Sequence, residues 1–182
     1  TAWSGAFFVP TFLTAGDFSA NSFTAATNLP AGSSPNTIGI ADLDRDGKPD
    51  IMTSSYYNKQ LLVFRNVSTN GLLAPGSFAP PVAFPYGMHS GGLASGDLDG
   101  DARPDVVVAS SSASELSILR NISSPGTFTS NSFAPAVILT GTAQACKVAI
   151  IDLDGDGKPE VITANYGGNI SIFRNVSIPG NP

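Results

Sequence analysis

Three short stretches of the chain place acidic side chains at every second position. The first, DLDRDGKPD at 42–50, has carboxylates at its positions 1, 3, 5 and 9. The related stretches are DLDGDARPD at 97–105 and DLDGDGKPE at 152–160, and twelve of the 14 acidic residues lie in the three. Like charges this close repel one another, so without a partner the cluster would lose stability or hold protons at raised pKa values. A bound divalent cation reverses that balance.

The spacing within each stretch fits a hard cation held by oxygen atoms. Carboxylates at positions 1, 3, 5 and 9, with a backbone carbonyl at position 7, approach the about six to eight oxygen ligands that Ca²⁺ takes. Mg²⁺ is the lesser alternative because it demands near-ideal octahedra and retains waters. We therefore expect up to three Ca²⁺ ions, with these ligand sets: Asp42, Asp44, Asp46, Lys48 (carbonyl) and Asp50; Asp97, Asp99, Asp101, Arg103 (carbonyl) and Asp105; Asp152, Asp154, Asp156, Lys158 (carbonyl) and Glu160.

The three acidic stretches differ at two positions that bear on affinity. Position 6 is Gly47 in the first stretch, whereas the second has Ala102. A tight turn there needs a positive φ, which a Cβ opposes by roughly 1 kcal/mol or more. We expect the site at 97–105 to be the weakest. In the third stretch Glu160 replaces aspartate at position 9, and its longer side chain is still expected to reach the ion.

The acidic stretches belong to a repeat of 55 residues. Their first aspartates lie at 42, 97 and 152, and phenylalanines at 23, 78 and 133 keep the same spacing. Arg-Asn dipeptides begin at 65, 120 and 174, each followed by a residue and a serine. We read one domain, 1–182, with repeats at about 17–71, 72–126 and 127–181 and a lead-in strand at 1–16. Because the arginines recur in every repeat, we expect them to form hydrogen bonds between repeats.

Each repeat has the pattern of four short strands. Strands named A precede the acidic stretches (NTIGIA, GGLASG, KVAII), B strands follow them (IMTSSY, VVVASS, VITANY), and C strands come next (LLVFRN, LSILRN, ISIFRN). A D strand passes through the recurring phenylalanine, as in SFAPPVAF. Apolar residues nowhere recur at helical spacing over three turns. Four antiparallel strands in 55 residues are typical of a β-propeller blade, so we predict an all-β fold of three blades.

The order of the strands predicts an array with two unfinished ends. A lone D strand near 22–28 precedes the first blade, and the third blade lacks its own D strand. Three blades do not close a ring, since about 4 to 8 are usual. One alternative is a piece of a longer propeller, which residues 5–13, in the position of a C strand, favour. The other is a head-to-tail homo-oligomer, in the simplest case a six-bladed dimer.

The segment VAIIDLDGDGKPEVITANYGGNISIFRN at 148–175 resembles the FG-GAP/VCBS repeat, the blade unit of integrin α-subunit propellers and of many secreted bacterial proteins. The resemblance extends over residues 17–178. It implies Ca²⁺ between the first two strands of each blade, held by the acidic residues named above, and a secreted or cell-surface location. Ala102 and Glu160 depart from the family pattern, and its Phe-Gly and Gly-Ala-Pro segments are not clearly present.

Outside the acidic stretches the chain has few groups suited to catalysis. It contains one histidine, His89, and the acids Asp17 and Glu115. We therefore expect no enzymatic activity. The formal net charge is −5 and no basic cluster is present, which argues against nucleic acid as a partner. No apolar stretch approaches the about 18 residues of a transmembrane helix, so we expect no membrane insertion.

A candidate binding surface lies where the repeats differ. In a propeller the B–C turns and D–A connections share the face opposite to the A–B loops, and here they are rich in aromatic and amide side chains: Tyr56, Tyr57, Asn58, Lys59, Tyr86, Met88, His89, Tyr166 and Asn169. Such groups suit glycans or protein loops. The sequence thus favours a calcium-stabilised, secreted adhesion or lectin-like module. The alternatives are a purely structural scaffold and a non-catalytic part of a carbohydrate-active propeller enzyme.

Overall fold

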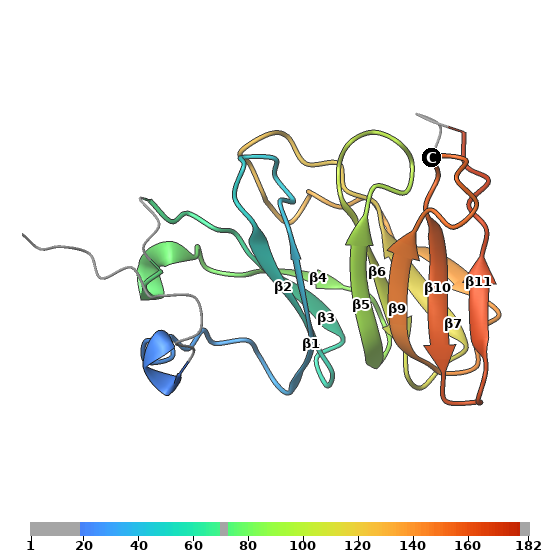
Figure 1. Cartoon of the computed structure of the whole chain (residues 1–182), viewed down its shortest axis with the longest axis horizontal. Helices are drawn as coiled ribbons and strands as arrows, with labels where there is room; N and C mark the ends of the chain where they lie inside the picture. The colour runs from blue at the N-terminus through green and yellow to red at the C-terminus, as the bar shows by residue number, and fades with distance from the viewer. Residues whose placement is uncertain (1–18, 70–72, 179–182) are drawn as a thin grey trace, which may run out of the picture.

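The computed structural model describes residues 19–69 and 73–178, which form three antiparallel sheets standing side by side (Figure 1). The sheets are, in order, β1 (Pro35–Ala41), β2 (Asp50–Ser55), β3 (Gln60–Phe64) and β4 (Val82–Pro85); β5 (Ser90–Gly96), β6 (Asp105–Ser110), β7 (Glu115–Leu119) and β8 (Val137–Thr140); and β9 (Ala145–Ile151), β10 (Glu160–Asn165) and β11 (Ile170–Phe173). Two 3-10 turns, η1 (Ala20–Ser22) and η2 (Pro75–Ser77), precede recurring phenylalanines. No helix of the described residues is long and apolar enough to cross a membrane.

The predicted all-β fold is confirmed, and its strands occur in the predicted order. Consecutive strands pair in every sheet, and β5 lies beside both β1 and β9, so that the A strands are the neighbours at the centre of the array (Figure 1). The D strands begin later than the sequence suggested. Phe78 forms an isolated β-bridge with Asn66, and Phe133 forms one with Asn121, in each case just after the C strand and before β4 or β8 begins.

The predicted D strand near 22–28 is wrong. Residues 20–22 form η1, and no strand is assigned between 23 and 34. A strand needs a neighbour for its backbone N–H and C=O groups. The described part of the chain places no C strand beside this segment, so the ladder cannot form. The predicted strands at 1–16 and 5–13 lie outside the described residues.

Apolar side chains of β6 join the three sheets into one body. Because side chains alternate along a strand, Val106 and Val108 point to one face of β6 and Val107 and Ala109 to the other. The first pair packs into the cluster shared with the first sheet, and the second pair into the cluster shared with the third. All of these side chains are fully buried, which explains why the sequence VVVA does not alternate with polar residues.

An aromatic cluster lies at the interface between the first and second blades, near their D strands. Phe84 of β4 packs against Phe128 and Phe133 of the second blade, with ring centroids 5.6 and 4.8 Å away and the rings nearly perpendicular. Edge-to-face pairs of this kind add about 0.5–1.5 kcal/mol to the burial of the rings. The recurring phenylalanine is therefore a contact between blades.

A polar clasp joins neighbouring blades at the end of the array that carries the acidic loops. Asn121 Nδ2 donates to the Leu43 carbonyl of the preceding blade at 2.8 Å, and Ser123 Oγ donates to the same oxygen at 2.9 Å. Asn175 and Ser177 make the same contacts with the Leu98 carbonyl, at 2.8 and 3.2 Å. We call each Asn-x-Ser donor pair with its carbonyl an Asn-Ser clasp. It explains why Asn-x-Ser recurs with the repeat.

Candidate metal centres

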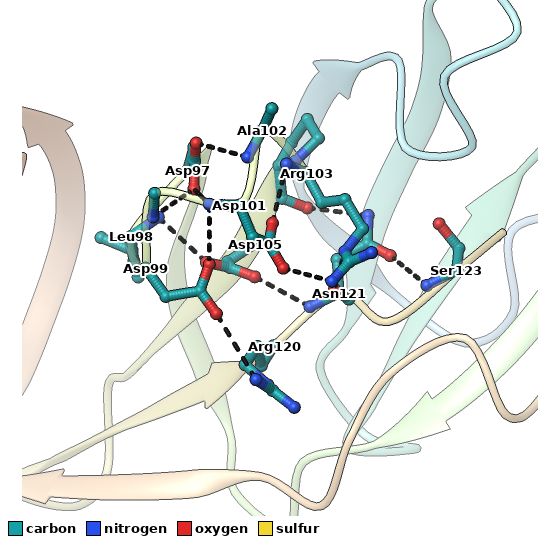
Figure 2. A network of polar contacts seen from close by, with 12 residues as sticks. Asp97, Leu98, Asp99, Asp101, Ala102, Arg103, Asp105, Arg120, Asn121 and Ser123 are labelled. Carbon is teal, nitrogen blue, oxygen red and sulfur yellow. Dashed lines mark hydrogen bonds and ion pairs between the residues drawn. The ribbon is translucent and has the colours of Figure 1, made fainter. Parts of the chain in front are cut away.

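Each acidic loop connects the A strand of a blade to its B strand, and all three lie at the upper end of the array in Figure 1. The aspartate at position 1 folds the loop around itself. The Asp42 carboxylate accepts the N–H groups of Asp46 and Gly47 at 3.0 and 2.9 Å. Asp97 does the same for Asp101 and Ala102, at 3.1 and 2.8 Å (Figure 2).

The acidic residue at position 9 ties the loop to the segment after the C strand. Figure 2 shows Asp105 accepting the N–H groups of Leu98 and Asn121, at 3.0 and 2.8 Å. Asp50 has the corresponding two bonds in the first loop. Glu160 takes this place in the third loop, where Leu153 N–H donates to it at 2.8 Å. A carboxylate oxygen has two lone pairs, so these bonds leave room for a cation.

Burial makes the position 9 carboxylates costly to ionise. Asp50 and Asp105 are 0% and 1% exposed. Burial raises the pKa of Asp50, and it raises the pKa of Asp105 to about 6, against the lowering effect of the N–H donors. The neighbouring carboxylates Asp99 and Asp101 raise the pKa of Asp105 further. A positive ion in the loop would relieve both effects.

Three groups of carboxylates could hold a metal ion. In each, ligand oxygens of three side chains lie within 4.8 Å of one another: Asp42, Asp44 and Asp50; Asp97, Asp99 and Asp101; Asp152, Asp154 and Glu160. Asp44 is fully buried, and its Oδ1 has no hydrogen-bond partner among the described residues. A buried carboxylate oxygen without a donor is costly, and a cation is the partner that a set of oxygen ligands suits.

The recurring arginines act inside their own blade, contrary to the expected bonds between blades. The Arg65 guanidinium pairs with Asp44, and its second nitrogen lies 3.5 Å from Asp46. In the third blade Arg174 Nε lies 2.9 Å from Asp154 Oδ2, which holds the pKa of that carboxyl below its ordinary value. Each arginine follows a C strand that runs beside the B strand, and this brings it under its own loop.

Two of the loops contain a non-glycine residue in the left-handed region. Ala102 has φ of 64°, as the turn at position 6 predicted, and Gly47 and Gly157 have 85°. Position 4 was missed by the sequence reasoning. There Arg45 has φ of 54°, while the other two loops have glycine. The two glycines at that position were the available signal. The first and second loops are therefore both strained.

Part of the predicted ligand surface is brought together at the opposite end of the array. Tyr56 stacks on His89 with centroids 4.6 Å apart, and His89 Nδ1 lies 3.2 Å from the Tyr56 carbonyl. The Tyr57 ring lies nearly perpendicular to that of Tyr56, with centroids 5.2 Å apart, and Tyr57 is 67% exposed. Asn58 beside it is also exposed. These four residues, Tyr56, Tyr57, Asn58 and His89, form what we call the aromatic turn cluster.

Two of the predicted surface residues are buried, so their assignment to a ligand surface is wrong. Tyr86 is 4% exposed and Met88 is 7% exposed. Both belong to the apolar cluster between the first two blades, where the Tyr86 hydroxyl donates to the Ser55 carbonyl at 3.1 Å. Tyr166 and Asn169 are exposed on the turn of the third blade, and the second blade separates them from the aromatic turn cluster (Figure 1).

Comparisons with known proteins agree with this architecture. The chain is similar to a solved structure described as BBS1N in complex with ARL6DN, soaked with mercury, with a TM-score of 0.51 and 15% identity. The match covers 80% of this chain and 38% of that chain, so this chain spans well under half of its length; at this identity the likeness shows the fold alone. No curated protein matches. Residues 97–163, which include the second and third acidic loops, match the family model of FG-GAP-like repeats. The resemblance read from the sequence is thereby confirmed: the chain contains an FG-GAP-like repeat, folded as blades of the β-propeller type.

Proposed function

We propose that the acidic loops bind Ca²⁺ and that the chain is a calcium-stabilised repeat module. The observation that carries this proposal is the first cluster, in which the fully buried Asp44 keeps an oxygen without a hydrogen-bond partner among the described residues, next to Asp42 and Asp50. An ion held by oxygen ligands would offset the repulsion and the desolvation of these carboxylates. Arg65 already offsets part of it, so the ion shares Asp44 with the guanidinium.

The same proposal places the module outside the cell. FG-GAP-like repeats, of which residues 97–163 are one, are typical of extracellular proteins. Extracellular calcium modules work with dissociation constants on the order of 10⁻⁴–10⁻³ M, which suits loops whose arginines compete with the ion. A secreted or cell-surface protein is the setting in which such sites are filled.

The test is calcium-dependent thermal unfolding, with Asp44→Asn as the variant. In calcium at about 100 times the dissociation constant, one filled site stabilises the folded state by about 2.7 kcal/mol relative to EDTA. Asp44→Asn should remove one calcium from the binding stoichiometry and shrink the rise in Tm. Glu115→Gln, which removes a carboxylate outside the loops, is the matched control and should leave the stoichiometry and the rise in Tm unchanged. Equal melting of the native protein in calcium and in EDTA would refute the proposal.

Isothermal titration ranks the three sites. The strain at Ala102 supports the proposal that the site at 97–105 is weaker than the third site, whose loop has glycine at positions 4 and 6; Arg45 strains the first loop as well, so strain does not rank the first two sites. Ala102→Gly should tighten this site without changing the others. Magnesium should give a smaller rise in Tm than calcium, because it retains its waters. Three equal affinities in the native protein would contradict the ranking.

We further propose that the aromatic turn cluster binds a glycan or an extracellular protein, and that the module is not an enzyme. The exposed Tyr57 ring, which packs nearly perpendicular to Tyr56 and next to the exposed Asn58, supports this. Tyrosine with an amide neighbour combines apolar contact and hydrogen bonding. A glycan array and a pull-down from extracellular proteins test it, with Tyr57→Ala expected to lose binding and Tyr166→Ala to retain it. Blank results in both assays would leave the scaffold alternative. Depolymerisation of a polysaccharide by the chain would show instead that it is an enzyme.

A further inference from the structure

The outer face of the third blade is apolar and exposed at positions that are buried in the first blade. Ile170 and Ile172 of β11 are 65% and 56% exposed. Their equivalents in β3, Leu61 and Val63, are completely buried, because the second blade covers them. These two positions of the C strand are therefore buried in the first blade, where a further blade follows. This face has the pattern of one that another blade covers.

A hollow of about 330 Å³ lies between the second and third blades. Its apolar lining includes Leu98, Ile118, Leu139, Val161 and Phe173. One repeat earlier, the equivalent residues are Leu43, Val63, Phe84, Val106 and Leu119, and they surround the rings of Phe128 and Phe133. The hollow is therefore the place where a phenylalanine of a D strand would pack.

The chain carries a segment with the local structure of that D strand, at its other end. Ser22 N–H donates to the Ser19 carbonyl at 2.9 Å, and Ser19 N–H donates to Ser22 Oγ at 3.1 Å. Thr129 and Ser132 form the same two bonds, at 3.0 and 2.8 Å, directly before Phe133. The turn before Phe23 is thus already made. Phe23 is 68% exposed, whereas Phe133 is 8% exposed.

The rest of this segment enters the first blade as a D strand enters the blade after it. Tyr56 N–H donates to the Ser34 carbonyl at 3.1 Å, and Ser111 N–H donates to the His89 carbonyl, the equivalent pair one repeat later, at 2.9 Å. Residues 27–31 lie over the outer face of β1 and β2, where they line a hollow with Ile38 and Ile51. Among residues 19–69 and 73–178 no C strand lies beside the segment.

We propose that residues 23–30 of one copy of this chain add to β11 of a second copy as the fourth strand of its third blade. In the described part of the chain β11 is an edge strand, and an edge strand is a template for this kind of pairing. Residues 23–30 and β11 lie at opposite ends of the array (Figure 1), so the segment cannot pair with β11 of the same copy.

The pairing of β3 with β4 predicts the register. Leu61 pairs with Phe84, Val63 with Val82, and Asn66 with Phe78. Shifted by the repeat, these pairs become Ile170 with Leu29, Ile172 with Thr27, and Asn175 with Phe23. In this register the Phe23 ring enters the hollow beside Leu139.

The Asn-Ser clasp carries the same inference independently. The Leu43 and Leu98 carbonyls each accept two clasp bonds, whereas no hydrogen bond to the Leu153 carbonyl is found among the described residues. At the other end, Asn66 Nδ2 donates to the Pro49 carbonyl and, within the described part of the chain, to no preceding blade. A second copy docked head to tail brings Asn66 and Ser68 to Leu153. Two such contacts make a closed ring of six blades, within the usual range of about 4 to 8.

The first test is the mass in solution. Light scattering should give about 37 kDa, twice the 18.6 kDa of one chain. Phe23→Ala and Ile172→Lys should each raise the dissociation constant of the dimer at least tenfold. Both side chains are largely exposed in the single chain, so circular dichroism should show an unchanged fold. Tyr57→Ala, equally exposed but on the turn between β2 and β3 and outside the segments proposed to pair, is the control and should dimerise normally. A native protein that stays monomeric at its highest soluble concentration would overturn the proposal.

The second test is the register, measured by disulfide formation between two different variants in a Cys146→Ser background. Directly opposed residues of antiparallel strands have Cα atoms about 4.5–5.5 Å apart, which suits a disulfide. Thr27→Cys mixed with Ile172→Cys should give a cross-linked dimer under mild oxidation. Asn28→Cys with Ile172→Cys is the control, because alternate residues point to opposite faces. Equal cross-linking of both mixtures, or none in a dimeric protein, would refute this register.

Discussion

Replacing Asn121 by alanine should destabilise the chain more than the same change at Asn66, and the difference measures the contact between blades. Asn121 is completely buried. Its side chain donates to the Leu43 carbonyl at 2.8 Å and to the Pro104 carbonyl at 3.0 Å, and it accepts Ser123 N–H at 2.9 Å. Only the first of these bonds crosses to the preceding blade.

The bonds give the magnitude. An intramolecular hydrogen bond contributes about 1 kcal/mol net, so Asn121→Ala should lower the free energy of unfolding by about 3 kcal/mol, and by slightly more where buried partners are left unpaired. Asn66 makes the two bonds within the blade, to Pro49 and from Ser68, both at 2.9 Å. Asn66→Ala should therefore cost about 2 kcal/mol. For a chain of this size the corresponding falls in Tm are about 6–12 °C and 4–8 °C.

The assay is urea unfolding followed by circular dichroism, in EDTA so that metal binding does not enter. It should be run with the dimer dissociated by Phe23→Ala in every variant, so that association does not enter either. Asn175→Ala, which loses the equivalent three bonds, should resemble Asn121→Ala. If Asn66→Ala lowers the free energy of unfolding as much as Asn121→Ala does, the hydrogen bond from Asn121 to the preceding blade contributes nothing and the reasoning fails.

Three further changes test the loops and the core. The pKa of Asp105 is about 6 in the folded state against an ordinary 3.8, so the folded state binds this proton more tightly than the unfolded state does. In EDTA, the contribution of Asp105 to the free energy of unfolding should therefore rise by up to about 3 kcal/mol as the pH falls from above 6 to below 4. Asp105→Asn should flatten that part of the curve of unfolding free energy against pH. Ala102→Gly relieves a positive φ and should raise the free energy of unfolding in EDTA by about 0.5–1 kcal/mol. Ala113→Gly, at an ordinary φ, should lower the free energy of unfolding. If both variants lower it, Ala102 is not strained. Phe133→Ala removes a buried ring packed on Phe84 and should cost about 3–5 kcal/mol in urea unfolding, and a cost below 1 kcal/mol would show that the aromatic cluster is loosely packed.

The strands were readable from the sequence because the repeat supplies three copies of each. The short runs rich in β-branched residues that directly follow each acidic loop gave β2, β6 and β10 within a residue. The lead-in segment shows the limit of this reasoning. Its sequence is that of a D strand, but a strand depends on a partner's backbone, and the described chain supplies none. The local turn before Phe23 formed, since its hydrogen bonds are internal, and the ladder did not.

Side-chain direction across a blade interface was less predictable than the strands. Tyr86 has an aromatic ring and a hydroxyl in a loop position, a composition that suits a ligand surface as well as a core. Its burial depends on the neighbouring blade, which lies 20 or more residues further along the chain. The arginines were misassigned for the same reason, because recurrence shows that a contact is structural without showing which blade receives it. In the second and third blades the asparagine that follows the arginine, Asn121 or Asn175, makes the contact between blades.

The acidic loop and the clasp are parts of one structure. Leu43, whose carbonyl accepts both clasp bonds, stands between Asp42 and Asp44, and its own N–H donates to Asp50. The position of that carbonyl is thus set by three of the carboxylates that form the candidate metal centre. Any charge that holds these carboxylates together also holds the acceptor on which the next blade docks. The sequence DLDRDGKPD therefore specifies more than a candidate cation site: the carbonyl of its second residue, Leu43, is where one blade is joined to another.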